Sequence, residues 1–400
     1  MTEIDSFQKL KAYCETEQFK GWDPFDGLNS KVLKTILPLK HFAIMRLIVI
    51  QGFKRCPWNL RPLFSIPKEY NAKGIGLFLQ GYCNLFKVAQ GNPTLESELG
   101  SKEVLIDKVN DLANLLISLR SKGYHGSCWG YNFDWQSRRL FLFPAYCPTV
   151  VATNFCATAL MDAFEVTGKK EYLDIALDSA NFILNDLHLD DYKGEKMISY
   201  SPLHGNDLVS NASLLGSKVL AYCYKYTGNE VYLKVARSSV RACCKGQRED
   251  GAWTYSQIPP KLWVDSFHTG YNLDGLIAYE EQTGDKDYHE NIERGFEYYI
   301  KNFFNEDGCP KYYNDQQYPI DIHCPGQLLV TLHRLHKFEK YEKLADMVLN
   351  WTIENMQDKK GYFYYQLKKG VSSKIPYMRW SNAFMFYAMS YYMLDKYKSS

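Results

Sequence analysis

The 400-residue sequence lacks a long apolar run. Its most apolar stretch, residues 41–53, contains Arg46 and is shorter than the roughly 20 residues that cross a bilayer. The N-terminal segment is charged and has no apolar core, so we expect no secretory signal peptide. The 11 cysteines are scattered and odd in number, which is typical of reduced, buried thiols. These absences predict a cytoplasmic protein without a membrane span.

The sequence also lacks an excess of charge of either sign, because the formal net charge is only +2. This balance gives no electrostatic reason to expect binding to nucleic acid or to an anionic membrane surface. The sequence has no C-x-x-C or H-E-x-x-H spacing, no Gly-rich phosphate loop and no G-x-S-x-G motif. We therefore expect no metal ion, no cofactor and no nucleic-acid partner.

What the sequence has in excess is aromatic residues, with 31 Tyr, 22 Phe and 8 Trp. Helical proteins bury aromatic side chains, but Tyr in this number also indicates a wet, aromatic-lined cavity. A Tyr ring offers a flat apolar face and one hydroxyl group. This combination suits sugar rings, which have apolar faces and polar edges.

A repeat of nearly sixty residues organises the middle of the chain. Segments starting at Thr153, Ser210 and Phe267 each contain an apolar helix, a Thr-Gly pair, three further residues, a Tyr and a second helix. The glycines of these pairs are expected to end the first helix in the left-handed conformation, and the Tyr to pack back on the corner. Each unit is therefore an αα-hairpin. The Thr-Gly pairs and their Tyr residues are Thr167-Gly168 with Tyr172, Thr227-Gly228 with Tyr232, and Thr283-Gly284 with Tyr288.

Weaker copies extend the repeat in both directions and bring the inner helices to six. A second, amphipathic helix follows each of the first five, as expected for an outer ring. We expect an N-terminal helix at about residues 31–51 to supply the sixth outer helix and to close the ring beside a C-terminal helix at about 379–395. The sequence thus predicts an all-α fold, an (α/α)6 toroid of six helical hairpins with short β-turn loops on one face, formed by residues 1–400 as one domain. An open solenoid is the alternative. The inner helices are expected to start near Gly76, Asn154, Asn211, His268, His323 and Asn382.

The loops that lead back to the inner helices should emerge on one face, where repeat proteins usually bind ligands. Polar residues recur there, at the N-termini of the inner helices, whose partial positive charge favours anions. Capping of the helices explains Asn and Asp at such positions equally well. Histidine is a poor cap, so acid–base catalysis is the preferred role for the two His residues. The recurring residues are Asn154, Asn211, Asp265, His268, Asp321, His323, Arg379 and Asn382.

A second dense stretch spans residues 129–138. Asp134 is a candidate acid or base, and Arg138, like Arg379, is a candidate for holding a sugar carboxylate in a bidentate pair. A structural salt bridge between Asp134 and Arg138 is the alternative. Aromatic residues in and after this stretch are candidates for stacking on sugar rings: Trp129, Trp135, Trp253, Tyr255 and Tyr271.

The chain resembles the six-hairpin superfamily of carbohydrate-active toroids. More closely, it is similar to bacterial proteins of capsule and exopolysaccharide gene clusters that carry polysaccharide-biosynthesis or prenyltransferase-like labels. The superfamily resemblance implies carbohydrate chemistry such as unsaturated uronyl hydrolysis, lyase elimination or uronate C5 epimerisation, and it extends to the helical C-terminal region of glucuronyl C5-epimerase. The motifs that carry the resemblance are WGYNFDWQSR (129–138), PTVVATNF (148–155), SNASLLG (210–216), WVDSFHTGYNLDGL (263–276) and YPIDIHCPGQ (318–327).

We therefore interpret the chain as an enzyme of surface polysaccharide biosynthesis that acts on a uronic-acid-containing glycan by acid–base chemistry, as a hydrolase, lyase or C5-epimerase. Its expected partners are an oligosaccharide or polysaccharide substrate and a polysaccharide assembly complex. A non-catalytic glycan-binding or scaffold toroid is the first alternative. A terpene-cyclase or prenyltransferase-like protein is the second, and it predicts an apolar pocket with clustered Asp residues, which the sequence lacks.

Overall fold

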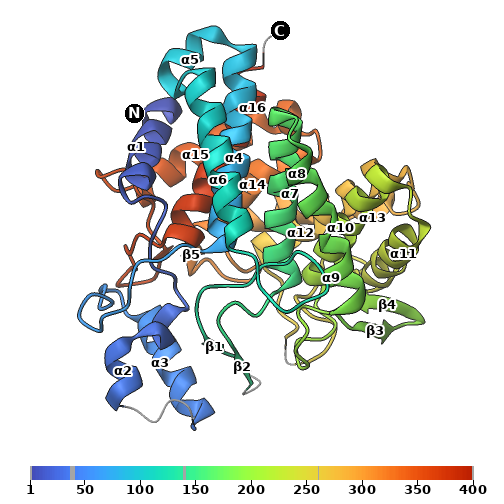
Figure 1. Ribbon diagram of the computed structural model, residues 1–400. Coiled ribbons are helices and arrows are strands. Elements are labelled where there is room, and N and C mark those ends of the chain that lie inside the picture. The colour runs from blue at the N-terminus through green and yellow to red at the C-terminus, as the bar shows by residue number, and fades with distance from the viewer. Residues whose placement is uncertain (1, 37–40, 138–140, 260, 399–400) are drawn as a thin grey trace.

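The computed structural model describes residues 2–36, 41–137, 141–259 and 261–398. Within these residues, inner and outer helices alternate along the chain and form two concentric rings (Figure 1). The inner helices are α4 (Ala72–Gly91), α7 (Val150–Thr167), α10 (Ser210–Thr227), α12 (Ser266–Thr283), α14 (His323–Arg334) and α16 (Phe384–Lys396). The outer helices are α6 (Lys102–Ser118), α8 (Lys170–Leu177) with α9 (Ser179–Asn185), α11 (Glu230–Lys245), α13 (His289–Phe303), α15 (Phe338–Met356) and α1 (Glu3–Thr16).

The Thr-Gly corners form as the repeat predicts. Gly168, Gly228 and Gly284 each end an inner helix in the left-handed conformation, with φ of 72°, 67° and 74°. The preceding Thr hydroxyl donates a hydrogen bond to the carbonyl four residues earlier, at 2.7 Å in all three corners. The glycine N–H donates to the Phe164, Tyr224 or Glu280 carbonyl, one of the last four of its helix, which have no intrahelical partner.

The inner ring closes between its last helix and its first. Each inner helix contacts the next along the chain, and α16 contacts α4. At this seam the ring of Phe386 fills the space beside Gly81, and Asn84 Nδ2 donates to Ser390 Oγ at 3.0 Å. The toroid is therefore confirmed, and the open solenoid is excluded.

The helix that completes the outer ring is α1, so the expectation for residues 31–51 was wrong. Helix α1 contacts α15 and α16. A Cβ at Gly361 would lie 2.2 Å from the Lys9 carbonyl oxygen of α1, just as one at Gly308 would lie 2.6 Å from the Met347 carbonyl oxygen of α15. The same glycine contact thus joins each turn to the next outer helix. The chain ends also meet here, since Tyr397 donates from its hydroxyl to Glu3 Oε1 at 2.9 Å.

Residues 31–51 belong instead to a small unit beside the ring, formed by η1 (Asp26–Asn29), α2 (Lys31–Ile36) and α3 (Ala43–Arg55), with residues 37–40 outside the described part. Its own small core contains Leu28, Leu33, Ile50, Phe53 and Ile66. Figure 1 shows the unit on the side of the ring where β1 (Trp135–Gln136) and β2 (Leu142–Phe143) lie. In the described part of the chain, two further antiparallel strand pairs are β3 (Leu189–Tyr192) with β4 (Glu195–Ile198) and β5 (Ile320–Asp321) with β6 (Gln366–Leu367).

Candidate active site

The starts of α12, α14 and α16 meet around a group of aromatic rings. His268 near the start of α12 makes an edge contact with the Tyr255 ring, with centroids 4.7 Å apart. His323 at the start of α14 lies 4.4 Å from the Trp380 ring, which precedes α16. The Phe267 ring lies between the two histidines. Its centroid is 5.2 Å from that of the His323 ring and 5.9 Å from that of the Trp380 ring. We call this group, together with Trp263, the aromatic mouth.

Asp265 and His268 form a hydrogen-bonded pair in the mouth. Asp265 is the N-cap of α12, and its Oδ1 accepts from the His268 backbone N–H at 3.0 Å. Its Oδ2 lies 2.7 Å from His268 Nδ1 and also accepts from Trp263 Nε1 at 3.0 Å. A carboxylate at Nδ1 favours the tautomer in which Nε2 is the basic nitrogen. The capping alternative for Asp265 is therefore correct, and the same carboxylate orients a histidine whose side chain keeps one fifth of its surface exposed.

The Tyr255 and Trp263 rings stack on each other next to this pair. Their centroids are 4.7 Å apart with an interplanar angle of 15°, and both side chains are half-buried. Tyr255 was among the expected stacking residues, and Trp263 was missed. Burial raises the pKa of the Tyr255 hydroxyl, so it stays protonated at neutral pH. The stacked pair leaves only the outer face of each ring available to a sugar ring near His268.

Asp321 is fully buried, and three donors occupy its carboxylate. Oδ1 accepts from the His323 backbone N–H at 3.0 Å and from Trp380 Nε1 at 2.9 Å. Oδ2 accepts from Gln366 Nε2 at 2.5 Å. Burial raises the pKa of Asp321. Its contacts fit a role in holding the start of α14 and the Trp380 ring better than the expected acid–base role.

His323 is held neutral by its surroundings. Its ring is buried and stacks on Phe384 with centroids 3.9 Å apart, and its Nδ1 has no hydrogen-bond partner. Burial lowers the pKa of His323 well below its usual value, and the positive charges of Lys73 and Arg379 add to the shift. His323 therefore presents a neutral ring, whereas His268 has a carboxylate partner.

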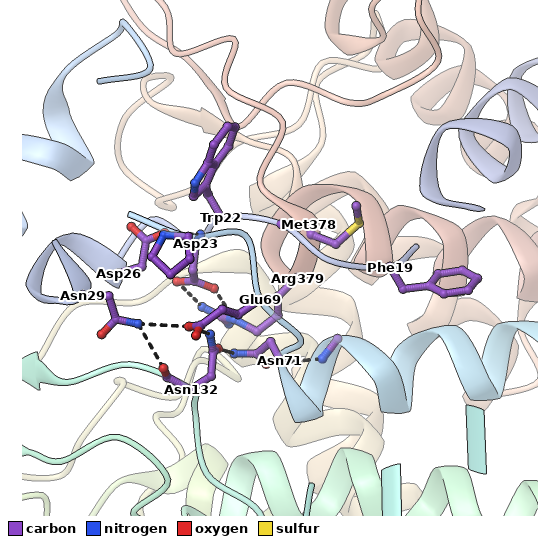
Figure 2. Close-up of a pocket in the computed structure, with 13 residues that line it drawn as sticks. Phe19, Trp22, Asp23, Asp26, Asn29, Glu69, Asn71, Asn132, Met378 and Arg379 are labelled. Atoms are coloured by element: carbon purple, nitrogen blue, oxygen red, sulfur yellow. Dashed lines mark hydrogen bonds and ion pairs between the residues drawn. The ribbon is translucent and has the colours of Figure 1, made fainter. Parts of the chain in front are cut away.

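Arg379 is already paired within the protein (Figure 2). Its Nε lies 2.5 Å from Asp23 Oδ2 and its Nη2 lies 2.9 Å from Asp23 Oδ1. The guanidinium also lies over the Tyr131 ring, 4.8 Å from the centroid. The expectation that Arg379 grips a substrate carboxylate is thus corrected, because Asp23 from the N-terminal segment takes that place.

A pocket next to this ion pair contains a polar network (Figure 2). Asn71 Nδ2 donates to Asn132 Oδ1 at 2.8 Å, and Asn132 Nδ2 donates to Glu69 Oε2 at 3.1 Å. Asn29 Nδ2 donates to the same Glu69 oxygen at 3.3 Å. The pocket adjoins the aromatic mouth through Arg379, whose guanidinium lies 5.1 Å from the Trp380 ring centroid. It brings a half-buried carboxylate, Glu69, close to the start of α4.

A buried amine lies near the mouth. Lys73 in the first turn of α4 donates from Nζ to the Tyr271 hydroxyl at 3.1 Å, and Nζ lies 4.1 Å from the Phe155 ring centroid. No carboxylate in the described part of the chain forms an ion pair with Lys73. Burial lowers the pKa of Lys73 well below its usual value, and the charge of Arg379 lowers it further. Such a lysine can exchange a proton far below pH 10.

Asn154 and Asn211 are not the caps that were considered for them. The N-cap residues of α7 and α10 are Thr149 and Val209, and the two Asn residues lie in the following turns. Both amide atoms of Asn154 and Nδ2 of Asn211 are buried without a hydrogen-bond partner. Buried polar groups are nearly always paired, so these carboxamides call for a ligand or a water.

Other expected site residues have structural roles. Trp129 and Trp253 are buried, and their indole N–H groups donate to the Leu116 carbonyl at 2.8 Å and the Cys243 carbonyl at 3.0 Å. Asn382 is also buried, with its amide oxygen accepting from Phe363 N–H at 2.9 Å. These three residues were expected to bind substrate. They are instead fixed between helices and loops by the protein's own backbone.

The stretch from 129 to 138 lies partly outside the mouth. The Trp135 ring stacks on Phe143 with centroids 4.5 Å apart, and Asp134 Oδ1 accepts from the Ala145 N–H at 2.7 Å. Arg138 lies outside the described residues, and so does the salt bridge considered between it and Asp134. Among the described residues, no three His, Cys, Asp or Glu side chains gather in a way that could hold a metal ion.

The functional candidates that were not predicted from the sequence have little in their local sequence that indicates a functional role. Asp23 and Glu69 precede the repeats, and Lys73 lies one residue into an apolar helix, where a charged side chain is usually a solvated one. The signal for Lys73 was its position in the first turn of an inner helix, three residues before Gly76. Trp263 lies two residues before Asp265, within a motif that was noted for its resemblance only.

Comparisons with known proteins agree with the geometry. A family model described as Glycosyl Hydrolase Family 88 matches residues 266–399, which include α12 to α16 and much of the mouth. No curated protein matches the chain. The fold and the family match support a carbohydrate-active enzyme built on an (α/α)6 toroid.

Solved structures share the whole architecture at low sequence identity. A cellobiose 2-epimerase from Bacillus thermoamylovorans has a TM-score of 0.63 and 13% identity, covering 83% of this chain and 90% of that one. A GH76 α-mannanase from Bacteroides thetaiotaomicron has a TM-score of 0.61 and 14% identity, with 82% and 86% covered. An unsaturated glucuronyl hydrolase specific for heparin has a TM-score of 0.61 and 14% identity, with 100% and 97% covered. These structures confirm the (α/α)6 toroid expected from the repeats.

Proposed function

We propose that the protein acts on a uronic-acid-containing glycan by proton transfer to or from a sugar carbon, with His268 as the acid–base group. The observation that carries this proposal is the Asp265–His268 pair beside the stacked Tyr255 and Trp263 rings. Asp265 orients the imidazole through Nδ1, which leaves Nε2 as the nitrogen that could exchange a proton with a substrate. A sugar ring stacked on the outer face of this aromatic pair would bring a ring C–H near His268.

The carboxylates favour this chemistry over two-carboxylate hydrolysis. Glycosidases of that type need two carboxyl groups that face each other across the scissile bond. Here Asp265 and Asp321 each accept three hydrogen bonds from the protein, and Asp134 holds a backbone N–H. A histidine base with a fixed partner matches epimerisation or elimination, in which one group removes the proton next to a carboxylate.

An anionic substrate is supported by the charge at this end of the ring. The N-termini of the inner helices meet here, and each carries partial positive charge. Lys73 is buried here without an ion-pair partner among the described residues, and Asn154 and Asn211 carry unpaired amide groups. A uronate carboxylate can accept hydrogen bonds from such groups. The biological setting that we propose is the biosynthesis of a surface polysaccharide in the cytoplasm, in association with its assembly complex.

Hydrolysis of an unsaturated uronyl residue is the second candidate. The Family 88 match over residues 266–399 favours it, as does the likeness to a heparin-specific unsaturated glucuronyl hydrolase. In this reaction His268 or Glu69 would supply the proton to the double bond.

Proton NMR in heavy water distinguishes these reactions. Wild type is incubated with saturated and unsaturated uronate oligosaccharides. Deuterium at C5 indicates an epimerase, a new alkene signal a lyase, and loss of the alkene of an unsaturated substrate a hydrolase. We expect His268→Ala to lower turnover by about 10²–10⁴-fold, the usual contribution of a general acid or base.

The matched control is His289→Ala, which changes an exposed histidine at the start of α13. It should leave turnover within about twofold of wild type. Equal turnover by His268→Ala and wild type would reject the role of His268. Binding of the glycans without any chemical change would support the non-catalytic alternative instead.

A further inference from the structure

A basic segment without acidic residues separates α1 from the repeats. Between Asp26 and Glu69 the chain has eight Lys or Arg residues and no Asp or Glu. The rest of the chain has 39 basic and 45 acidic residues, so the small net charge conceals two regions of opposite sign. Four of the basic side chains, Lys31, Lys34, Arg55 and Lys68, are exposed, and Lys68 forms an ion pair with Glu17. The segment therefore forms a local positive surface despite the overall balance.

The same segment exposes an unusual share of the apolar surface. Of the thirteen large hydrophobic side chains exposed in the described part of the chain, six lie between residues 36 and 63. They are more than half exposed, and Trp58 and Leu63 reach 71% and 74%. Exposed apolar side chains that are concentrated in one segment, rather than scattered singly over the surface, usually mark an interaction site. The six are Ile36, Phe42, Ile44, Ile48, Trp58 and Leu63.

Helix α3 shows how the two properties combine. Ile50 and Phe53 point into the small core, whereas Ile44 and Ile48 are 63% and 65% exposed. Arg55 follows at a spacing that places it on the same helix face as the two isoleucines. One side of α3 thus anchors the unit, and the other presents apolar and basic groups together.

We propose that α2, α3 and the residues up to Leu63 form a docking surface for an anionic phospholipid bilayer. Peripheral helices bind bilayers by inserting an apolar face while Lys and Arg side chains contact anionic headgroups. Charge complementarity favours this occupant, because the surface is basic and has no acidic residue. No described helix is long and apolar enough to cross a membrane, which fits attachment at the interface.

Other occupants match the surface less well. A free acidic glycan would satisfy the basic side chains but would leave the Ile and Trp side chains without an apolar partner. A second copy of the chain in a two-fold dimer would place like charges against each other.

Vesicle flotation with the full chain tests the proposal. We expect wild type to float with vesicles of phosphatidylcholine containing about 30 mol% phosphatidylglycerol, and to stay unbound with phosphatidylcholine alone. Ile44→Ser with Ile48→Ser should weaken binding by roughly tenfold or more, because two inserted apolar side chains are lost. Lys31→Gln, Lys34→Gln and Arg55→Gln together should weaken it by roughly a hundredfold, at about fivefold for each charge.

The matched control is Val104→Ser with Val231→Ser, which removes two apolar side chains that are also more than half exposed, from the outer helices α6 and α11. It should bind the vesicles like wild type. All variants change exposed residues, and unchanged urea unfolding midpoints confirm that they fold. The proposal is overturned by absence of binding to the anionic vesicles at low salt, or by unchanged binding of the isoleucine variant. A vesicle-independent dimer that the isoleucine variant abolishes would also overturn it, in favour of self-association.

Discussion

His268 and His323 begin neighbouring inner helices, yet their environments differ. His268 contacts a carboxylate and keeps some exposure, while His323 is buried between Phe384 and Trp380 near two cations. The sequence placed both at the same end of the ring, which the repeat pattern predicts. It could not distinguish them, because the burial of His323 depends on Trp380 and Phe384, more than fifty positions away.

The pH dependence of stability should report the burial of His323. Its folded pKa lies well below the unfolded value of about 6.5, so below that pH the unfolded chain takes up a proton that the folded chain does not. Stability is therefore lost as pH falls through about 6.5, by at most about 1.4 kcal/mol per pH unit for this group. His323→Phe should remove this contribution and flatten the profile of unfolding free energy.

Urea unfolding at several values between about pH 7.5 and pH 5 measures the effect. His333, whose pKa burial also lowers, is present in both proteins and cancels in the comparison. The exposed His289→Ala variant serves as the control and should keep the wild-type slope. Parallel profiles for wild type and His323→Phe would contradict the buried, neutral state.

Lys73 should show opposite effects on stability and on turnover. Lys73→Met keeps the length of the side chain and removes an amine that burial holds without a carboxylate. We expect the free energy of unfolding at pH 7 to rise by about 1–3 kcal/mol. Because the unfolded lysine loses its own proton near pH 10.4, the gain should shrink as pH rises toward that value. Turnover of a uronate substrate should fall, since the substituted side chain cannot donate a proton or a hydrogen bond.

The control for this variant is Lys234→Met on the exposed side of α11, which should change stability by less than about 0.5 kcal/mol. A loss of stability in Lys73→Met, at every pH, would mean that the Tyr271 hydrogen bond outweighs the cost of burying the amine.

Among the helices, the repeats could be predicted from sequence because each corner combines Thr-Gly with a following Tyr. The sixth outer helix could not, although its pattern is visible in retrospect. Phe7, Leu10 and Cys14 follow a helical spacing and are buried against the ring. The sixth outer helix was instead assigned to a region that includes the more apolar residues 41–53, but part of their apolar surface faces outward. Local apolarity therefore predicted helical structure there correctly, but it did not predict what the helix packs against.

Two alanine substitutions separate the roles of α1 and α3. Phe7 is fully buried, with its ring 4.9 Å from Phe386, so Phe7→Ala should lower the free energy of unfolding by about 3–5 kcal/mol. Ile48 on α3 is 65% exposed, so Ile48→Ala should change it by less than about 0.5 kcal/mol. Urea unfolding of both variants provides the measurement, and a larger loss for Ile48→Ala would mean that α3 is packed against a part of the ring.

Across the whole molecule, the sequence predicted the architecture well and the distribution of charge poorly. Repeats report the ring because each unit buries its core against its neighbours. Net charge is a single sum, and it gave no reason to expect the basic surface between residues 27 and 68. The candidate site was also predicted incompletely from the sequence, because Asp23 forms an ion pair with Arg379, which is 356 positions away in the chain.

The seam between α1 and α16 also bears on how the chain can be rearranged. Glu3 and Tyr397 are hydrogen-bonded, so the two ends lie side by side. A short linker can join them, and new ends can be opened at an exposed corner such as Gly228–Asn229. The ring then keeps every contact between neighbouring hairpins. In a closed ring of repeats, the fold does not depend on the repeat at which the chain starts. We therefore expect circular permutation to be tolerated at each such corner.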